Sequence, residues 1–222
     1  MMELETYFDY TIKILILGHT GVGKTNIITM FMDKIFNQGH MTTSGIDLKT
    51  TCIELNNRKI RIQLWDTCGQ EKYKSITTNL FLKVQGILAV YDITNRNSFS
   101  ILKNWVKSIK SDGNHPKMLI IGNKIDLNES REVPKDEAIE YAKEEKIEYI
   151  ETSCKTGENI YKSITLICEK IMDDSSFEKD VSFALDTSSV LRKNRHKCCW
   201  YKKINSIELF FFESYWKAEN EI

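Results

Sequence analysis

The feature that most constrains this chain is a glycine-rich loop set between a short apolar run and a helical pattern. Residues 18–25 read GHTGVGKT, which has the form G-x-x-x-x-G-K-[ST]. The apolar run at residues 12–17 predicts a strand, and residues 24–32 have the spacing of a helix. A strand, a glycine loop and a helix in this order predict a loop that binds the phosphates of a nucleotide.

Each residue type in the loop has a role in binding a polyphosphate. The glycines leave the backbone free to turn its N–H groups toward the phosphates. Lys24 places a positive charge on the β and γ phosphates, and the Thr25 hydroxyl can ligate Mg²⁺. A glycine turn beside a solvated lysine is the alternative, but the full pattern arises by chance in under about one chain in a hundred. The residues expected to contact the phosphates are Thr20, Gly21, Val22, Gly23, Lys24, Thr25 and Asn26.

A second motif, Asn123-Lys124-Ile125-Asp126, predicts the base. The Asp126 carboxylate only accepts hydrogen bonds, so it suits the N1–H and amino donors of guanine and opposes the N1 acceptor of adenine. An unpaired buried polar group costs about 1–3 kcal/mol, so Asp126 would discriminate against ATP. Alone, the motif is more often a polar loop after a strand, but behind a phosphate loop it predicts guanine. Ser153, Cys154 and Lys155 follow another short strand and are expected to bring backbone N–H groups to the guanine O6.

Strand and helix signals alternate along the chain without an internal repeat. Strands expected at residues 48–55 and 59–65 meet at Asn56-Asn57, which signals a hairpin. The pattern predicts an α/β fold with a mostly parallel sheet and one antiparallel edge strand. Further strands are expected at residues 86–92, 118–122 and 147–151, and a last helix at about residues 158–172. The helix positions expected to face the core are Phe99, Leu102, Val106, Ile109, Ile160, Ile164, Ile167 and Ile171.

Taken together, the motifs resemble those of the Ras-superfamily small GTPases, and specifically of the Rab family. The residues that carry the resemblance are the phosphate loop, Thr43, residues 65–71 (WDTCGQE), 123–126 and 153–155, supported by residues 44–48 (SGIDL) and 91–94 (YDIT). The resemblance implies a P-loop NTPase small G domain over residues 8–172, with a six-stranded sheet and about five helices. Residues 173–222 would then form a hypervariable, mostly disordered tail.

The resemblance also implies a site that hydrolyses GTP to GDP and phosphate. Asp66 and Thr43 would complete the Mg²⁺ shell begun by Thr25, and the Gly69 N–H would bond the γ-phosphate. In the family the threonine that matches Thr43 also contacts the γ-phosphate. Loss of that phosphate would therefore release the loops that it holds in place. The bound ligands implied are GTP or GDP and Mg²⁺.

Gln70 matches the family's glutamine that orients the attacking water, and Lys24 would act beside it in catalysis. No arginine in the sequence matches a built-in arginine finger, so hydrolysis is expected to be slow until an activating protein accelerates it. Phe36 stands where the family stacks an aromatic ring on guanine. Its alternative role is that of a core residue closing the first helix.

Partners implied by the resemblance are exchange factors, activating proteins, dissociation inhibitors and effectors of the Rab type, acting in vesicle traffic. The family's effector-binding aromatic positions correspond to Leu48, Trp65 and Leu80, so two of the three aromatics are replaced. Simple local packing is the alternative for these three. A nucleotide-binding scaffold with little turnover is the competing function, while Asp126 disfavours a P-loop ATPase or kinase.

The charge of the chain indicates what it does not bind, and its hydropathy indicates where the protein is located. A formal net charge of +0 and a pI of about 6.9 argue against nucleic acid as a partner. The acidic start of the chain lacks a signal-peptide pattern, and no apolar stretch approaches the roughly 18–20 residues of a membrane span. We therefore expect a cytoplasmic protein, held on the cytosolic face of intracellular membranes if it is prenylated.

The tail contains a basic run, residues 192–197, followed by Cys198 and Cys199. Paired cysteines receive geranylgeranyl groups in Rab tails, and basic residues add attraction to anionic lipid. Prenylation, however, needs cysteines at or near the terminus, and residues 200–222 follow here. This extension is either a short amphipathic anchor or the product of a mis-assigned coding end.

The six cysteines do not suggest a disulfide framework. Cys52 and Cys168 fall in strand and helix patterns and are expected in the core. Cys68 and Cys154 occupy nucleotide-motif positions where the family usually has alanine. Nucleotide binding should tolerate both, and a thiol beside the site raises the hypothesis of redox sensitivity.

Overall fold

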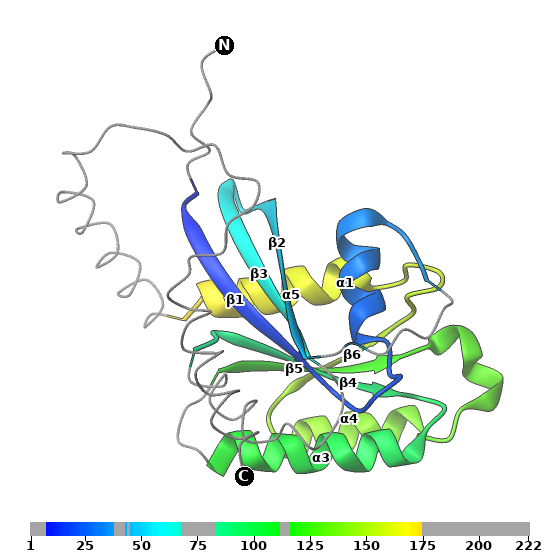
Figure 1. The fold of residues 1–222 in the computed structure, drawn as a ribbon. Coiled ribbons are helices and arrows are strands. Elements are labelled where there is room, and N and C mark those ends of the chain that lie inside the picture. Colours follow the sequence, from blue (N-terminus) through cyan, green and yellow to red (C-terminus); the bar gives the residue numbers. More distant parts are fainter. Residues whose placement is uncertain (1–7, 38–42, 44, 68–82, 112–115, 175–222) are drawn as a thin grey trace, which may run out of the picture. The chain divides into compact units, whose positions relative to one another are not determined.

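The computed structural model describes residues 8–37, 43, 45–67, 83–111 and 116–174. All of them belong to the first of the two units into which the chain divides, Met1–Val181, and only this unit is described. Its centre is a six-stranded sheet in the order β2-β3-β1-β4-β5-β6 (Figure 1). The strands are β1 (Tyr10–Leu17), β2 (Ile46–Leu55), β3 (Arg58–Thr67), β4 (Gly86–Asp92), β5 (Lys117–Asn123) and β6 (Glu148–Thr152).

The pairing of the strands confirms the predicted mostly parallel sheet with one antiparallel edge. β2 runs antiparallel to β3, while the other neighbouring pairs are parallel. The β2–β3 turn is made by Asn56 and Asn57, both with left-handed backbone at φ 51° and 58°. Two successive left-handed residues form the turn whose twist matches a β-hairpin, and asparagine tolerates this conformation well. The predicted hairpin is therefore confirmed.

Helices cover both faces of the sheet, as Figure 1 shows. On one face, α1 (Lys24–Asp33) and α5 (Ile160–Met172) touch through the rings of Phe31 and Tyr161, whose centroids are 5.7 Å apart. On the other, α3 (Arg96–Ser111) and α4 (Lys135–Glu144) are joined by ion pairs. A 3-10 helix, η2 (Ile125–Ser130), lies between β5 and α4.

The core is built from the alternation of strand residues between these two helical layers. Ile12, Ile14 and Ile16 of β1 are buried with residues of α1 and α5, while Ala89 and Tyr91 of β4 are buried with residues of α3 and α4. All eight helix positions expected to face the core are buried, which confirms the predicted faces of α3 and α5. α5 begins at Ile160, two residues later than predicted, after Asn159 in a left-handed conformation.

The expectation for the strand cysteine is wrong, because Cys52 is exposed. It lies on the edge strand β2, where Ile53 and Leu55 pack against the core. Since neighbouring strand residues point to opposite faces, Cys52 is turned away from that core. Cys168 of α5 is fully buried, as expected.

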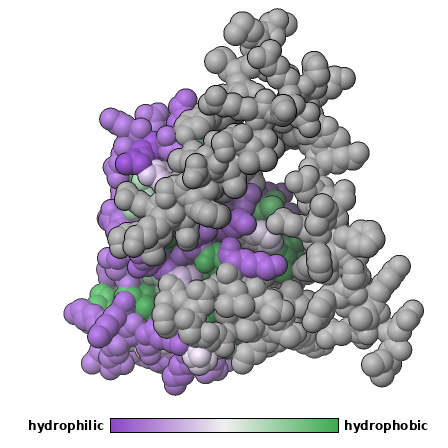
Figure 2. All heavy atoms as spheres, turned by 90° about the vertical axis from the view of Figure 1, so that its left-hand side faces the viewer, coloured by the Kyte–Doolittle hydropathy of each residue, from purple (hydrophilic) through white to green (hydrophobic). Residues whose placement is uncertain are grey.

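The face of the described part that Figure 2 shows is largely polar. Most of the coloured atoms in Figure 2 belong to hydrophilic residues, and hydrophobic residues show there only in small groups. Within the described ranges, none of the helices combines the length and apolarity needed to cross a bilayer.

The carboxyl ends of the parallel strands meet at one edge of the sheet. β1 leads there into the glycine loop, β3 ends near Asp66, and β5 ends at Asn123. In open parallel sheets the ligand binds in the crevice outside this edge. The fold therefore gathers residues from distant motifs at one place.

Candidate nucleotide site

The glycine loop that connects β1 to α1 is shaped by close backbone approaches. A Cβ at Gly18 would lie 2.2 Å from the Val90 carbonyl oxygen, and one at Gly23 would lie 2.4 Å from Asn123 Nδ2. Gly23 also has a left-handed backbone, with φ 102°. Both positions therefore exclude any side chain.

Lys24 is buried under the loop that it follows, with 6% of its surface exposed. Its Nζ donates to the carbonyl oxygens of Gly18 at 2.9 Å and His19 at 3.0 Å. Within the described residues no side-chain hydrogen bond caps the start of α1, which follows the loop directly. A helix N-terminus and an ammonium group on the same loop make a strong anion site.

Three side-chain oxygens converge beside this loop from three separate segments. Thr25 Oγ1 donates to Asp66 Oδ2 at 2.6 Å and lies 2.9 Å from Thr43 Oγ1. Thr43 Oγ1 lies 3.4 Å from the same carboxylate oxygen. Hydroxyl and carboxylate oxygens are the ligands that Mg²⁺ prefers. The structure brings together the three residues predicted to hold the metal.

The Asp66 carboxylate has the features of a cation ligand. Its Oδ1 is buried and has no hydrogen-bond partner within the described part of the chain. Burial raises the pKa of Asp66, against the lowering effects of the Thr25 hydrogen bond and the Lys24 charge. A buried, half-satisfied carboxylate is costly unless a positive charge compensates it, and this fits Mg²⁺.

Asn123 ties the base motif to the phosphate loop. Its side chain is buried, and Nδ2 donates to the Val22 carbonyl oxygen at 2.8 Å. Its Oδ1 accepts from Thr152 Oγ1 at 3.1 Å. The two motifs predicted to bind opposite ends of a nucleotide are thus joined directly.

The remaining base residues lie on two adjacent segments. Asp126, exposed on η2, accepts a hydrogen bond from Ser153 Oγ at 2.6 Å. Lys124 has a left-handed backbone and its Nζ lies 2.6 Å from Asp92 Oδ2. Lys155 is exposed. Sequence reasoning noticed Asp92 only as part of the YDIT motif and missed its ion pair with Lys124.

Other predicted contacts are placed only in part. Phe36 is half-buried and packs against the core cluster of α1 and α5, while Asn26 Nδ2 donates to the Asn37 carbonyl oxygen at 3.0 Å. The ring stacking of Phe36 on guanine stays a prediction. Gly69, Gln70, Cys68, Cys198 and Cys199 lie outside the described residues, so their predicted roles also stay predictions.

Two of the three predicted effector positions are neighbours on the β2–β3 hairpin. Leu48 and Trp65 are direct cross-strand partners. Leu48 is 37% exposed, whereas Trp65 packs against the buried cluster around Leu17 and Val84. Leu80 lies outside the described residues. The effector role of this surface stays a prediction.

Cys154 is buried against the base motif, with its Sγ 3.5 Å from Asn123 Oδ1. Burial raises the pKa of its thiol to about 11. Since only the thiolate reacts with alkylating reagents, on the order of one molecule in ten thousand would be reactive at pH 7. The structure therefore gives no support to redox sensitivity through Cys154, while Cys68 lies outside the described residues.

We predict that Cys154 resists iodoacetamide at pH 7.5 and reacts faster as the pH approaches 11, because its charged form is disfavoured below that value. Peptide mass spectrometry after timed labelling measures this, and the exposed Cys52 in the same molecule serves as the internal control. Labelling of Cys154 as fast as Cys52 at pH 7.5 would contradict the prediction.

Comparisons with known proteins agree with these motifs. The model of the Ras family matches residues 13–173. Ras-related protein Rab-8 of Diplobatis ommata is 39% identical over 166 residues, which cover 74% of this chain and 79% of that protein. Ras-related protein Rab-13 of Canis lupus familiaris is 36% identical over 196 residues, covering 86% and 97%. Ras-related protein Rab-1 of Theileria parva is 37% identical over 194 residues, covering 85% and 88%.

Proposed function

The chain belongs to the Ras family and, within it, to the Rab small GTPases that hydrolyse GTP in vesicle traffic, and we propose that the crevice at the carboxyl ends of its strands is the site of that reaction. The observation that carries the proposal is the hydrogen bond from Asn123 to the Val22 carbonyl, since it fixes the base motif against the phosphate loop. A site joined in this way suits one ligand with a guanine at one end and phosphates at the other.

The phosphate end is bound by the loop and Lys24. Backbone N–H groups of residues 20–26 and the start of α1 point at the anion. Lys24 Nζ, which now donates to two loop carbonyls, is within the same loop and would turn to the β and γ phosphates. In this position the N–H groups and the ammonium group would stabilise the negative charge that develops on the phosphates during transfer.

Mg²⁺ would be held by the Thr25 and Thr43 hydroxyls and, through water, by Asp66, and it would supply positive charge that neutralises the phosphates. Gln70 would orient the attacking water without itself changing charge. Thr43, which precedes β2, would be held while Mg²⁺ and the γ-phosphate are bound and released when that phosphate is lost. This is the switch that Rab-type exchange factors, activating proteins, dissociation inhibitors and effectors would read.

Prenylation of the tail would determine where the protein works in the cell. We propose that the protein works on the cytosolic face of intracellular membranes when Cys198 and Cys199 are prenylated. The intact mass of protein purified from its native cell would decide between a lipid-modified shorter chain and the unmodified chain of 222 residues.

We predict slow single-turnover hydrolysis of GTP by the purified protein and acceleration by up to about 10⁵-fold with the catalytic domain of a Rab-activating protein. Gln70→Leu should remove the stimulation while leaving GTP binding intact. A scaffold with little turnover would show no stimulation of the unaltered chain. An unstimulated rate already on the order of ten per second would contradict the missing arginine finger.

A further inference from the structure

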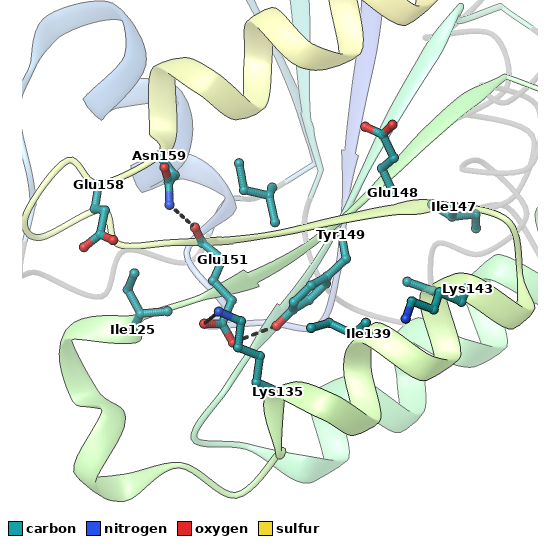
Figure 3. A pocket seen from close by; sticks show the side chains of 12 residues that line it. Ile125, Lys135, Ile139, Lys143, Ile147, Glu148, Tyr149, Glu151, Glu158 and Asn159 are labelled. Carbon is teal, nitrogen blue, oxygen red and sulfur yellow. Dashed lines mark hydrogen bonds and ion pairs between the residues drawn. The ribbon is translucent and has the colours of Figure 1, made fainter.

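A partly buried polar cluster links the two segments that carry the base-binding residues, and no part of the proposed reaction uses it. Its centre is the carboxylate of Glu151, the fourth residue of β6. Figure 3 shows this side chain in the wall of a pocket of about 570 Å³, with Tyr149 and Lys135 beside it. We call Arg131, Glu151, Tyr149 and Tyr91 the Glu151 cluster.

The carboxylate is held from two sides. Arg131 donates through its two terminal nitrogens to Glu151, at 2.7 Å to Oε1 and 3.3 Å to Oε2. Tyr149 Oη donates to Oε1 at 2.8 Å. The side chains of Arg131 and Glu151 are 18% and 11% exposed, so this ion pair is well shielded from water. A shielded, bidentate ion pair fixes the relative position of its two side chains and also stabilises the structure.

A second hydroxyl extends the cluster into the middle of the sheet. Tyr91 Oη on β4 lies 2.9 Å from Tyr149 Oη on β6. Gly122 on the intervening strand β5 makes room for them, because a Cβ there would lie 2.8 Å from each hydroxyl oxygen. Burial raises the pKa of Tyr91 to about 12, so it stays neutral and can donate. With Tyr149 donating to Glu151, the chain runs in one direction, from Tyr91 to the carboxylate.

The cluster connects the η2 segment to residues 151–155, the two segments that carry the base-binding residues. Arg131 directly follows η2, which carries Asp126, and it donates through Nε to Asn128 Oδ1 at 2.8 Å within that helix. Glu151 precedes Ser153 by two residues, and its carbonyl oxygen accepts from Asn159 Nδ2 at 2.9 Å (Figure 3). The Ser153–Asp126 hydrogen bond is thus one contact between the two segments. The Arg131–Glu151 ion pair is a second contact, and it is well shielded from water.

We infer that Glu151 is a positioning residue for guanine recognition: oriented by Tyr149, it binds Arg131 and so fixes the η2 segment against residues 151–155, so that Asp126 meets the N1–H and amino groups of the base. The inference rests on the proposed function. It names residues that do not contact the nucleotide and that act only through the segments they hold.

The test compares Glu151→Gln and Tyr149→Phe with two matched controls. Glu145→Gln removes the same charge from an ion pair between the residue that follows α4 and Lys110 of α3, away from the base segments. Tyr141→Phe removes a buried hydroxyl that has no hydrogen-bond partner within the described ranges. Each protein is assayed for unfolding in urea, dissociation of GDP and of inosine diphosphate, which lacks the amino group, and single-turnover hydrolysis of bound GTP.

We expect Glu151→Gln to accelerate GDP release by about tenfold or more and Tyr149→Phe by about threefold, the sizes of a lost charged and a lost neutral hydrogen bond. The preference for GDP over inosine diphosphate should shrink in both, while hydrolysis of bound GTP stays unchanged because Lys24, Thr25 and Asp66 are untouched. Both controls should release the two nucleotides like the unaltered protein.

A purely structural role gives a different result. Glu151→Gln and Tyr149→Phe would then lower the free energy of unfolding but keep the unaltered ratio of GDP to inosine diphosphate affinity, and this overturns the inference. If Glu151→Gln does not fold, the milder Tyr149→Phe decides. Failure of the proposed function is a separate outcome, because the unaltered protein itself would then show no preference for guanosine over adenosine nucleotides.

Discussion

Replacing Asp126 with asparagine is expected to weaken GDP binding by about 10²- to 10⁴-fold and to create binding of xanthosine diphosphate. The aspartate carboxylate can accept from both the N1–H and the amino group of guanine, whereas an asparagine amide brings a donor against one of those donors. Xanthine carries a carbonyl in place of the amino group and accepts from that amide. Competition between nucleotides for a fluorescent guanine nucleotide on the purified variant measures both changes.

Two controls separate base recognition from local damage. Asp136→Asn makes the same change in the first turn of α4, outside the candidate site, and should leave both affinities unaltered. Ser153→Ala removes the hydroxyl that now donates to Asp126 at 2.6 Å and should have a much smaller effect on base choice. If Asp126→Asn keeps its preference for guanine, Asp126 is not the residue that reads the base.

A second large effect is expected at Gly23. Its Cβ in a Gly23→Ala variant would lie 2.4 Å from Asn123 Nδ2, so either the loop or the asparagine must move. Because Asn123 links the base motif to Val22, either movement distorts both halves of the site. We expect GDP affinity to fall by at least about a hundredfold and the free energy of unfolding by about 2–4 kcal/mol.

The matched control for this variant is Gly45→Ala. Gly45 also has a left-handed backbone, at φ 88°, but a Cβ there would meet no atom of the described residues within 4 Å. It should therefore show only the backbone strain, about 1–2 kcal/mol of unfolding free energy, with nucleotide binding retained. Titration of GDP by calorimetry and urea unfolding measure the two quantities. Equal losses of GDP affinity in the two variants would show that the contact with Asn123 is unimportant.

Local patterns in the sequence predicted much of this fold because they are set by neighbouring residues. The spacing of Phe99, Leu102, Val106 and Ile109 identified the buried face of α3, and Asn56-Asn57 identified the hairpin. Both rest on short-range geometry, the helical repeat and the left-handed turn. The order of motifs also predicted that the phosphate loop and Asn123 belong to one nucleotide site.

Features that depend on tertiary contacts could not be predicted in this way. Alternation along β2 shows that Cys52 and Ile53 face opposite sides, but not which side a helix covers, and Cys52 was assigned to the wrong one. The pairing of Arg131 with Glu151 joins residues 20 apart in sequence, because the fold brings the segment after η2 against β6. Nothing in either local sequence distinguishes it from two solvated charges.

The bond between Asn123 and Val22 also bears on how the molecule is assembled. It closes a loop of 101 residues, and Asn123 belongs to the fifth of six strands. Contacts between residues so far apart form late, after the entropy of closing the intervening chain has been overcome. During synthesis the glycine loop emerges early but gains its support only when β5 is released from the ribosome, so capture of the ligand is expected to mark the end of folding and not its beginning.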